Sequence, residues 1–449
     1  MRRHSSLILL ICCFSLVLFG CKSTEQLPQG KMQKQPNNQT GTPPMGPPPD
    51  SIKPMEPPPE RGKMMTPPSM SSQTEINGTA KVTYTTDQTL ANMTYTSMTQ
   101  DENALLVENG AKVSMTNATV TKSKEATSNT ENSDFYGQNA AILVRDGSTL
   151  SLSGSTVSSS AQGGNAIFAY GKDSHIDIKN TKISTTANNS GGLDCAGGAS
   201  ISGSGLTIAT AGQSAASIRS DRGGGILSLE GGTYMTSGTG SPAIYSTADI
   251  TVKNAILNAK TSEAVVIEGK NSATLENCDV TGSMVSNEHV QTILLYQSMS
   301  GDAEVGHSTF TMTGGFLTGK TGDLFYVTNT TSSINLENVK LSLANGVLLT
   351  VSGNDSPRGW GKSGANGGTC TLTAKTQVLA GTISCDAISS LDISLTNNSS
   401  FVGQITNEGT TNVTLDGTST WTLTGDSTIS SIKGNKAQIN TNGYKLTIK

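Results

Sequence analysis

The chain has few of the side chains on which most catalytic and nucleic-acid-binding sites depend. Only 4% of its 449 residues are aromatic, 14% are charged, and four are histidines. The net charge of -4 offers no positive field to nucleic acid, so we expect no such partner. Globular enzymes of this length usually carry more charge and more large side chains.

Cysteine and histidine are too dispersed to predict a metal centre or a cofactor. No CxxC pair occurs, and the calcium-binding glycine–aspartate repeats of some β-rolls are absent. Four cysteines stand singly where similar segments carry Val, Ala or Ile, which predicts buried thiols acting as small apolar side chains. They are Cys195, Cys278, Cys370 and Cys385.

What the chain does contain is a repeated eight-residue pattern, apolar-x-apolar-x-(Asn/Gly)-small-x-apolar. It recurs at steps of about 24 residues, with three steps enlarged by roughly a dozen. A fixed period in this range is typical of a solenoid, in which each unit contacts its neighbours. The copies begin at Val113, Leu150, Ile176, Ile201, Leu227, Ile250, Ala273, Phe310, Ile334 and Cys370.

The pattern predicts strands separated by a sharp bend. Apolar residues alternate with Thr, Ser, Asp and Lys, which indicates one buried and one solvated face. The fifth position is Asn or Gly in nine copies and Ala374 in the tenth. Asn and Gly best tolerate a left-handed backbone, so the chain is expected to turn there.

A coil of this size cannot bury enough apolar surface to be stable alone, so each must stack on the next. We therefore predict an all-β fold: a single-stranded, right-handed parallel β-helix of about thirteen coils over residues 74–449. Residues 74–100 would cap the first strand edge, which could otherwise pair with other chains. We expect a monomeric rod.

The N-terminal residues predict export and lipid attachment. Residues 1–20 combine a basic start with a short apolar run that ends in LFGC, which resembles a bacterial lipobox. Cleavage before Cys21 would leave this residue as the lipidated N-terminus. The protein would then be anchored to the cell membrane and face outside, unless the segment is an ordinary signal peptide with an incidental cysteine.

Residues 21–73 predict a disordered linker. Thirteen of the fifteen prolines lie between Pro28 and Pro68, and such a segment cannot build a core. A spacer that holds the rod away from a membrane is the favoured interpretation, and a proline-rich ligand for a peptide-binding partner is the alternative.

Stacking would turn one strand position into a column of side chains. Two alternate positions of the strand before each pattern should face outward, where they would form an exposed strip of aromatic and charged groups. Such a strip suits an extended glycan, because aromatic faces stack on sugar rings and Asp and Arg bind hydroxyls. The candidate ligand-binding residues are Phe168, Tyr170, Asp194, Arg219, Asp221, Tyr245 and Trp360.

This interpretation of the strip has one alternative, and the chain has a second set of candidate binding regions. Phe168, Tyr170 and Tyr245 would merely pack if a neighbouring loop covered them. The enlarged coils, residues 122–138, 283–306 and 353–368, are further candidates because insertions in a solenoid emerge as surface loops. Trp360 lies in the third of them, in the string SPRGWGKSG with Arg358, and would either contact a ligand or fasten its loop.

The repeats resemble the pectin-lyase-like right-handed β-helix superfamily. Strings such as DENALLVENG, SDFYGQNAAILV, GSPAIYSTADITV and LYQSMSGDAEVG are similar to those of uncharacterised, adhesin-like β-helix lipoproteins of gut-type bacteria. This resemblance implies an adhesin-like or carbohydrate-binding module whose partner is a glycan or another host- or cell-surface polymer. It rests on fold analogy and not on demonstrated chemistry.

The wider superfamily also contains polysaccharide lyases and hydrolases, although their motif strings do not occur here. If the chain were such an enzyme, paired carboxylates on adjacent coils could act as acid and base. The catalytic residues would then be Asp194, Asp221, Arg219 and Arg222. We expect no catalysis and treat a structural stalk without a ligand as the third possibility.

Overall fold

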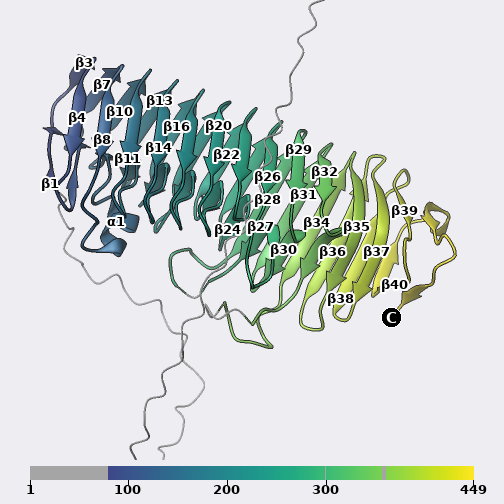
Figure 1. Ribbon diagram of the computed structural model, residues 1–449. Coiled ribbons are helices and arrows are strands. Elements are labelled where there is room, and N and C mark those ends of the chain that lie inside the picture. Colours follow the sequence, from purple (N-terminus) through teal and green to yellow (C-terminus); the bar gives the residue numbers. More distant parts are fainter. Residues whose placement is uncertain (1–78, 299, 356–359) are drawn as a thin grey trace, which may run out of the picture. The chain divides into compact units, whose positions relative to one another are not determined.

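The computed structural model describes residues 79–298, 300–355 and 360–449, which belong to one compact unit of stacked strands (Figure 1). The predicted signal sequence, Cys21 and the proline-rich linker lie outside the described residues, and so does Arg358. Three long sheets, all of parallel strands, run along the described unit. The predicted parallel β-helix is therefore confirmed.

Each coil before the last ones adds one strand to each sheet in a fixed order. In one coil the chain passes through β9 (Ile142–Val144), turns into β10 (Thr149–Ser153), bends, and continues as β11 (Thr156–Ser159). These strands belong to sheets of 15, 14 and 10 strands, which we call the 15-strand, 14-strand and 10-strand sheets.

The 15-strand sheet supplies the face on which the candidate site lies. Its other strands are β2 (Thr83–Tyr84), β6 (Leu105–Val107), β12 (Ile167–Tyr170), β15 (Leu193–Ala196), β18 (Ile218–Ser220), β21 (Ile244–Ser246), β24 (Val265–Glu268), β27 (Gln291–Tyr296), β30 (Asp323–Thr328), β33 (Val347–Val351), β35 (Val378–Cys385), β37 (Ser400–Asn407), β39 (Thr420–Thr422) and β42 (Ile439–Asn440).

The 14-strand sheet contains most of the repeated pattern, alternating between buried and partly exposed residues. Its other strands are β3 (Gln88–Ala91), β7 (Lys112–Thr116), β13 (His175–Lys179), β16 (Ala199–Ser204), β19 (Gly225–Glu230), β22 (Asp249–Lys253), β25 (Ser272–Glu276), β28 (His307–Thr313), β31 (Thr331–Glu337), β34 (Thr369–Lys375), β36 (Ser390–Thr396), β38 (Thr410–Leu415) and β41 (Ser431–Lys433).

The 10-strand sheet follows the bend and ends before the last coils. Its other strands are β4 (Thr94–Ser97), β8 (Thr119–Lys122), β14 (Lys182–Thr185), β17 (Thr207–Thr210), β20 (Thr233–Thr236), β23 (Ile256–Ala259), β26 (Asp279–Gly282), β29 (Phe316–Gly319) and β32 (Lys340–Leu343). Beyond it the eight-residue β35 follows the bend directly, so the final coils have two long sides.

Short elements complete the described chain. β1 (Thr79–Ala80) pairs with β5 (Glu102–Asn103), and β40 (Ser427–Ile429) pairs with β43 (Leu446–Ile448). The 3-10 helix Lys436–Gln438 and the helix α1 (Thr130–Tyr136) lie between strands. No helix among the described residues is long and apolar enough to cross a membrane.

The segment expected to cap the first coil supplies strands of that coil. From residue 79 onward it provides β2, β3 and β4, which are the outermost strands of the three long sheets. The sheet edge at this end therefore belongs to the segment itself.

The core is a set of aligned apolar columns between the sheets. Ile142 pairs with Ile167, Ile167 with Leu193, and the same column continues to Ile218, Ile244 and Val265, as the sequence predicted. All these side chains are fully buried, and each contributes about 1.5–3 kcal/mol relative to an exposed position.

The bend is a second aligned column, and its backbone is left-handed as predicted. Successive coils place Asn117, Gly154, Asn180 and Gly205 one above another, with φ between 48° and 62°. One assignment was wrong. Ile334 pairs with Leu372 and not with Cys370, so the tenth bend is at Thr376, with φ of 49°, and not at Ala374.

The four cysteines of the described chain are free and buried, as predicted. Burial raises the pKa of Cys195 and of Cys370 to about 12. These thiols therefore stay protonated and serve as apolar side chains.

Two glycines with nearly the same backbone angle offer a test of the stacked bend. A Cβ at Gly315, where φ is 77°, would lie 2.1 Å from the Cys278 carbonyl oxygen of the adjacent coil. A Cβ at Gly346, where φ is 76°, would meet nothing within 4 Å. We expect Gly346→Ala to lower the free energy of unfolding by about 1–2 kcal/mol through left-handed strain alone.

Gly315→Ala should cost about 2 kcal/mol more, because the coil must move away from its neighbour. Urea unfolding followed by circular dichroism compares the two variants. Equal losses would mean that close contact between coils at this bend does not constrain the fold.

Candidate functional site

The outer face of the 15-strand sheet is covered over much of its length. Every residue of β24, β27 and β30 is buried, whereas β10 and β13 in the 14-strand sheet alternate. A strand buried at every position has neighbours on both faces. Something other than the core must therefore lie against the outside of this sheet.

The cover consists of insertions at the two corners that flank the sheet. Residues 123–141, which include α1, and residues 283–290 precede its strands, while residues 297–306 and 352–368 follow them. Their described parts project on one side of the coils in Figure 1. The prediction that residues 283–306 form one surface loop was wrong, because β27, in the middle of this segment, is a strand of the sheet.

The first insertion folds back as a short helix. Asn129 caps α1 by accepting a hydrogen bond from the Asn132 backbone N–H at 3.2 Å, and Gly137 ends it in a left-handed conformation. A Cβ at Gly137 would lie less than 3 Å from side-chain atoms of Leu143 and Phe168, so the backbone here packs directly on these two side chains.

The outward column has the predicted alignment but not the predicted exposure. Pairing aligns Leu143, Phe168, Asp194, Arg219 and Tyr245 in that order. Phe168 and Asp194 are 0% exposed. The exposed strip is wrong here because α1 and its flanking residues cover the column, and Tyr170 meets Tyr136 edge-on at 5.4 Å between ring centroids.

Beneath this cover lies a buried charge cluster of Asp134, Asp194, Arg219 and Asp221. Arg219 Nε lies 2.6 Å from Asp221 Oδ2 and 3.6 Å from Asp194 Oδ2, and its Nη1 lies 3.1 Å from Asp134 Oδ1. Three carboxyl groups thus share one guanidinium in a space nearly closed to solvent. The three predicted residues Asp194, Arg219 and Asp221 do meet, but away from the surface.

Burial shifts the titration of two carboxyl groups in the cluster upward. Burial raises the pKa of Asp194 well above 3.8, against the attraction of Arg219, and the carboxyls of Asp221 and Asp134 add to the rise. Burial raises the pKa of Asp221 to about 7 despite its contact with Arg219. One cation cannot stabilise three buried anions, so protonation removes the excess negative charge.

The fourth expected catalytic residue has another partner. Arg222 Nε donates to Asp302 Oδ1 at 2.9 Å, and its guanidinium lies 3.9 Å from the centroid of the Phe135 ring. It therefore joins α1 to residues 297–306 and takes no part in the buried charge cluster.

A second buried carboxylate lies further along the sheet. Glu268 is 1% exposed, and its Oε2 accepts hydrogen bonds from the hydroxyls of Tyr245 at 2.6 Å and Tyr296 at 2.8 Å. Ser298 donates to the other oxygen. Tyr245, a predicted ligand residue, is thus committed to an internal network.

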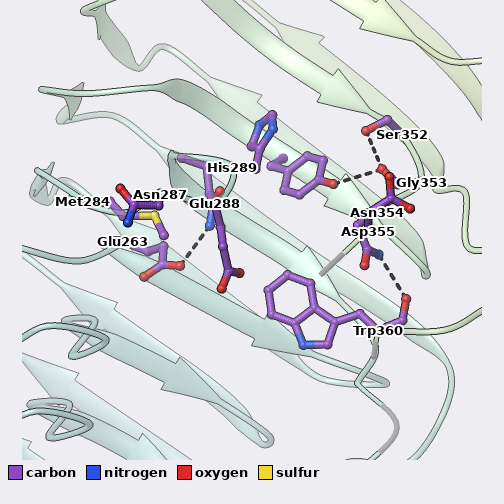
Figure 2. Close-up of a pocket in the computed structure, with 12 residues that line it drawn as sticks. Glu263, Met284, Asn287, Glu288, His289, Ser352, Gly353, Asn354, Asp355 and Trp360 are labelled. Carbon is purple, nitrogen blue, oxygen red and sulfur yellow. Dashed lines mark hydrogen bonds between the residues drawn. The ribbon is translucent and has the colours of Figure 1, made fainter. Parts of the chain in front are cut away.

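An open cleft occurs where the covering insertions leave a gap. Its volume is about 390 Å³, within the range of small-ligand sites. Figure 2 shows Met284, Asn287 and Glu288 with Glu263 on one side, and Asn354, Asp355 and Trp360 on the other. The lining residues are Glu263, Met284, Asn287, Glu288, His289, Gln291, Tyr326, Ser352, Gly353, Asn354, Asp355 and Trp360.

A histidine held by a carboxylate forms one wall of the cleft. His289 Nε2 lies 2.9 Å from Asp323 Oδ2, and the imidazole stacks on the Tyr326 ring with centroids 4.0 Å apart. Thr350 and Asn345 also donate to Asp323. Burial raises the pKa of Asp323, but these hydrogen bonds and His289 outweigh it and lower the pKa below 3.8.

The opposite wall is an anchored loop that presents Trp360. Asn354 donates from Nδ2 to the Thr328 hydroxyl at 2.8 Å, and Asn366 Nδ2 donates to the Trp360 carbonyl oxygen at 2.9 Å. The Trp360 ring lies 4.6 Å from the Tyr296 ring. Trp360 therefore packs against Tyr296 and is also partly exposed to the cleft. Of the predicted ligand residues, Trp360 alone is among the described residues that line this cleft.

The sequence contained signals for the residues that were missed. Tyr326 continues the outward column through Val266 and Leu294, three coils beyond Tyr245, the last candidate in that column. His289 lies in an enlarged coil that was already a candidate. The continuous apolar runs VVI, ILLY and LFYV also indicate strands buried on both faces, but no sequence pattern pointed to Glu263.

No family model matches the chain, and no curated protein matches it significantly. In the described part of the chain, no group of three or more His, Cys, Asp or Glu is arranged to hold a metal ion.

The buried charge cluster predicts an unusual dependence of stability on pH. Asp194 has a pKa raised above its value near 3.8 in the unfolded chain, so the folded state binds more protons at intermediate pH. The free energy of unfolding should therefore fall as pH rises from about 4 through neutrality.

Asp194→Asn should weaken this fall and raise the free energy of unfolding at pH 8. The reason is that the variant replaces a carboxyl group whose ionised form is costly to bury with a neutral amide. Asp392→Asn, at an exposed residue of the 14-strand sheet, is the control and should leave the pH dependence unchanged. Thermal unfolding midpoints measured from pH 4 to pH 8 test this prediction. Parallel curves for wild type and Asp194→Asn would contradict the conclusion that Asp194 causes the fall in stability.

Proposed function

We propose that this protein is a lipid-anchored, extracytoplasmic surface protein whose β-helix binds an extended glycan in the cleft between His289 and Trp360. The observation that carries the proposal is a partly exposed tryptophan facing an aromatic–histidine stack across an open, polar cleft. The anchor, through Cys21, and the outward location rest on the sequence.

The chemistry of the cleft supports a sugar ligand. Trp360 and His289 present flat rings, which stack on the apolar faces of pyranoses. Carboxyl and amide groups of Glu288, Asn287 and Asp355 surround them and can bind hydroxyls. The loops that carry these groups are fastened to a rigid solenoid, so a ligand meets a largely formed site.

The proposal predicts which aromatic residues matter for binding. Trp360→Ala should weaken binding of a glycan identified on an array about tenfold or more, corresponding to about 1.4 kcal/mol. Trp360→Phe should retain much of the affinity. Tyr170→Ala should have no effect, because Tyr170 lies beside Tyr136 in the covered region and does not line the cleft.

Isothermal titration of the full-length protein measures the three affinities. A loss for Tyr170→Ala with none for Trp360→Ala would move the binding surface back to the N-terminal coils. Circular dichroism confirms that each variant is folded.

The His289–Asp323 pair favours one alternative, cleavage of a polysaccharide. A histidine oriented by a carboxylate can act as a general base, and Glu263 and Glu288 lie in the same cleft. Prolonged incubation with the bound glycan, followed by analysis of new reducing ends, tests it. Products that disappear in His289→Ala would establish an enzyme, and an intact polymer would leave a binding module.

A further inference from the structure

The described lining residues of the cleft carry an excess of negative charge. Glu263, Glu288 and Asp355 contribute carboxyl groups to its lining, while His289 is paired with Asp323. No lysine or arginine occurs among its described lining residues. A ligand with its own carboxylates would meet like charge here, and a cationic ligand would meet opposite charge.

A buried amide in the lining has an acceptor that no described protein group satisfies. Gln291 is 2% exposed, and its Nε2 donates to Glu263 Oε1 at 2.9 Å. A carboxylate only accepts hydrogen bonds, so this contact fixes the orientation of the amide. The Gln291 Oε1 atom remains without a donor among the described residues. A buried acceptor of this kind costs about 1–3 kcal/mol, which a donor on the ligand would recover.

Within the described part of the chain, the neighbouring carboxyl group has only neutral partners. Glu263 is 8% exposed and accepts from Gln291 and, at 2.6 Å, from the Ser262 hydroxyl. None of the ion pairs formed within the described residues includes Glu263. A largely buried carboxylate without a cation is most stabilised by a cation that enters with the ligand.

We propose that the ligand of the cleft is a glycan bearing free, protonated amines, that is, a polymer containing unacetylated 2-amino-2-deoxy sugars. This inference rests on the proposed glycan-binding function and names its ligand class. An ammonium group supplies three donors and a positive charge, which match Gln291 Oε1 and Glu263. The flat Trp360 ring favours a sugar over a flexible polyamine or a lysine-rich peptide, because neither has a ring face to stack.

The test compares matched oligomers on the full-length protein by titration calorimetry. The probes are β-1,4-linked glucosamine tetrasaccharide, the same tetrasaccharide fully N-acetylated, tetragalacturonate, tetralysine and spermine. We expect the glucosamine oligomer to bind at least tenfold more tightly than the acetylated one and tetragalacturonate to show no binding. Added salt should reduce this preference.

Three variants connect the preference to the cleft. Glu263→Gln, and separately the double variant Glu288→Gln with Asp355→Asn, should reduce the preference for the amine to a few-fold. The double variant changes exposed residues, so it keeps the test valid if Glu263→Gln fails to fold. Glu276→Gln, on the outer face of the 14-strand sheet, should change nothing.

The outcomes separate this inference from the proposed function. Equal or tighter binding of the acetylated or the galacturonate oligomer would overturn the amine requirement and leave glycan binding intact. Tetralysine or spermine binding as tightly as the glucosamine oligomer would overturn the sugar requirement. Failure of all these probes, together with a negative glycan array, would overturn both proposals.

Discussion

The structure depends on the vertical register between successive coils. Asn117, Gly154, Asn180 and Gly205 each take a left-handed conformation, and their backbone N–H groups bond to the coil above. Because strand side chains alternate with a period of two, a slip of one residue would turn the apolar core outward. The bend and the core columns therefore require the same register between coils. This register also determines which outward-facing side chains lie next to one another on successive coils.

That register also explains where a site can form. The repeated turns are short, so a surface hollow requires extra chain at the corners. Extra chain occurs at both corners of the 15-strand sheet and folds over its outer face. Near α1 the cover is closed and traps the charges around Arg219, whereas between His289 and Trp360 it stays open. The same sheet thus carries a sealed polar region and an accessible one.

The fold was predictable because one constraint repeats many times, and the errors occurred where repetition gives no information. A shift of two residues preserves the strand pattern, so Cys370 and Leu372 were equally good starting points. Only the bend residue distinguishes them, and Thr376 is neither Asn nor Gly. The burial of Phe168 and Asp194 was not predictable from periodicity, because it arises from an insertion that folds back over other coils. Trp360 was found because tryptophan is rare here, and Glu263 was missed because nothing in its local sequence differs from an ordinary strand end.

The contact of Arg222 with Phe135 and Asp302 has a consequence for how the rod comes apart. A pure solenoid behaves as a one-dimensional chain, in which each unit is coupled only to the next and the ends can fray independently. Arg222 ties together two insertions that enter the coils far apart in sequence, with 80 residues separating it from Asp302. The central coils thus gain a long-range link that the C-terminal coils lack among the described ion pairs. Unfolding should therefore begin at the C-terminal coils and proceed toward the coils that Arg222 links. Those linked coils should then unfold together in one cooperative step.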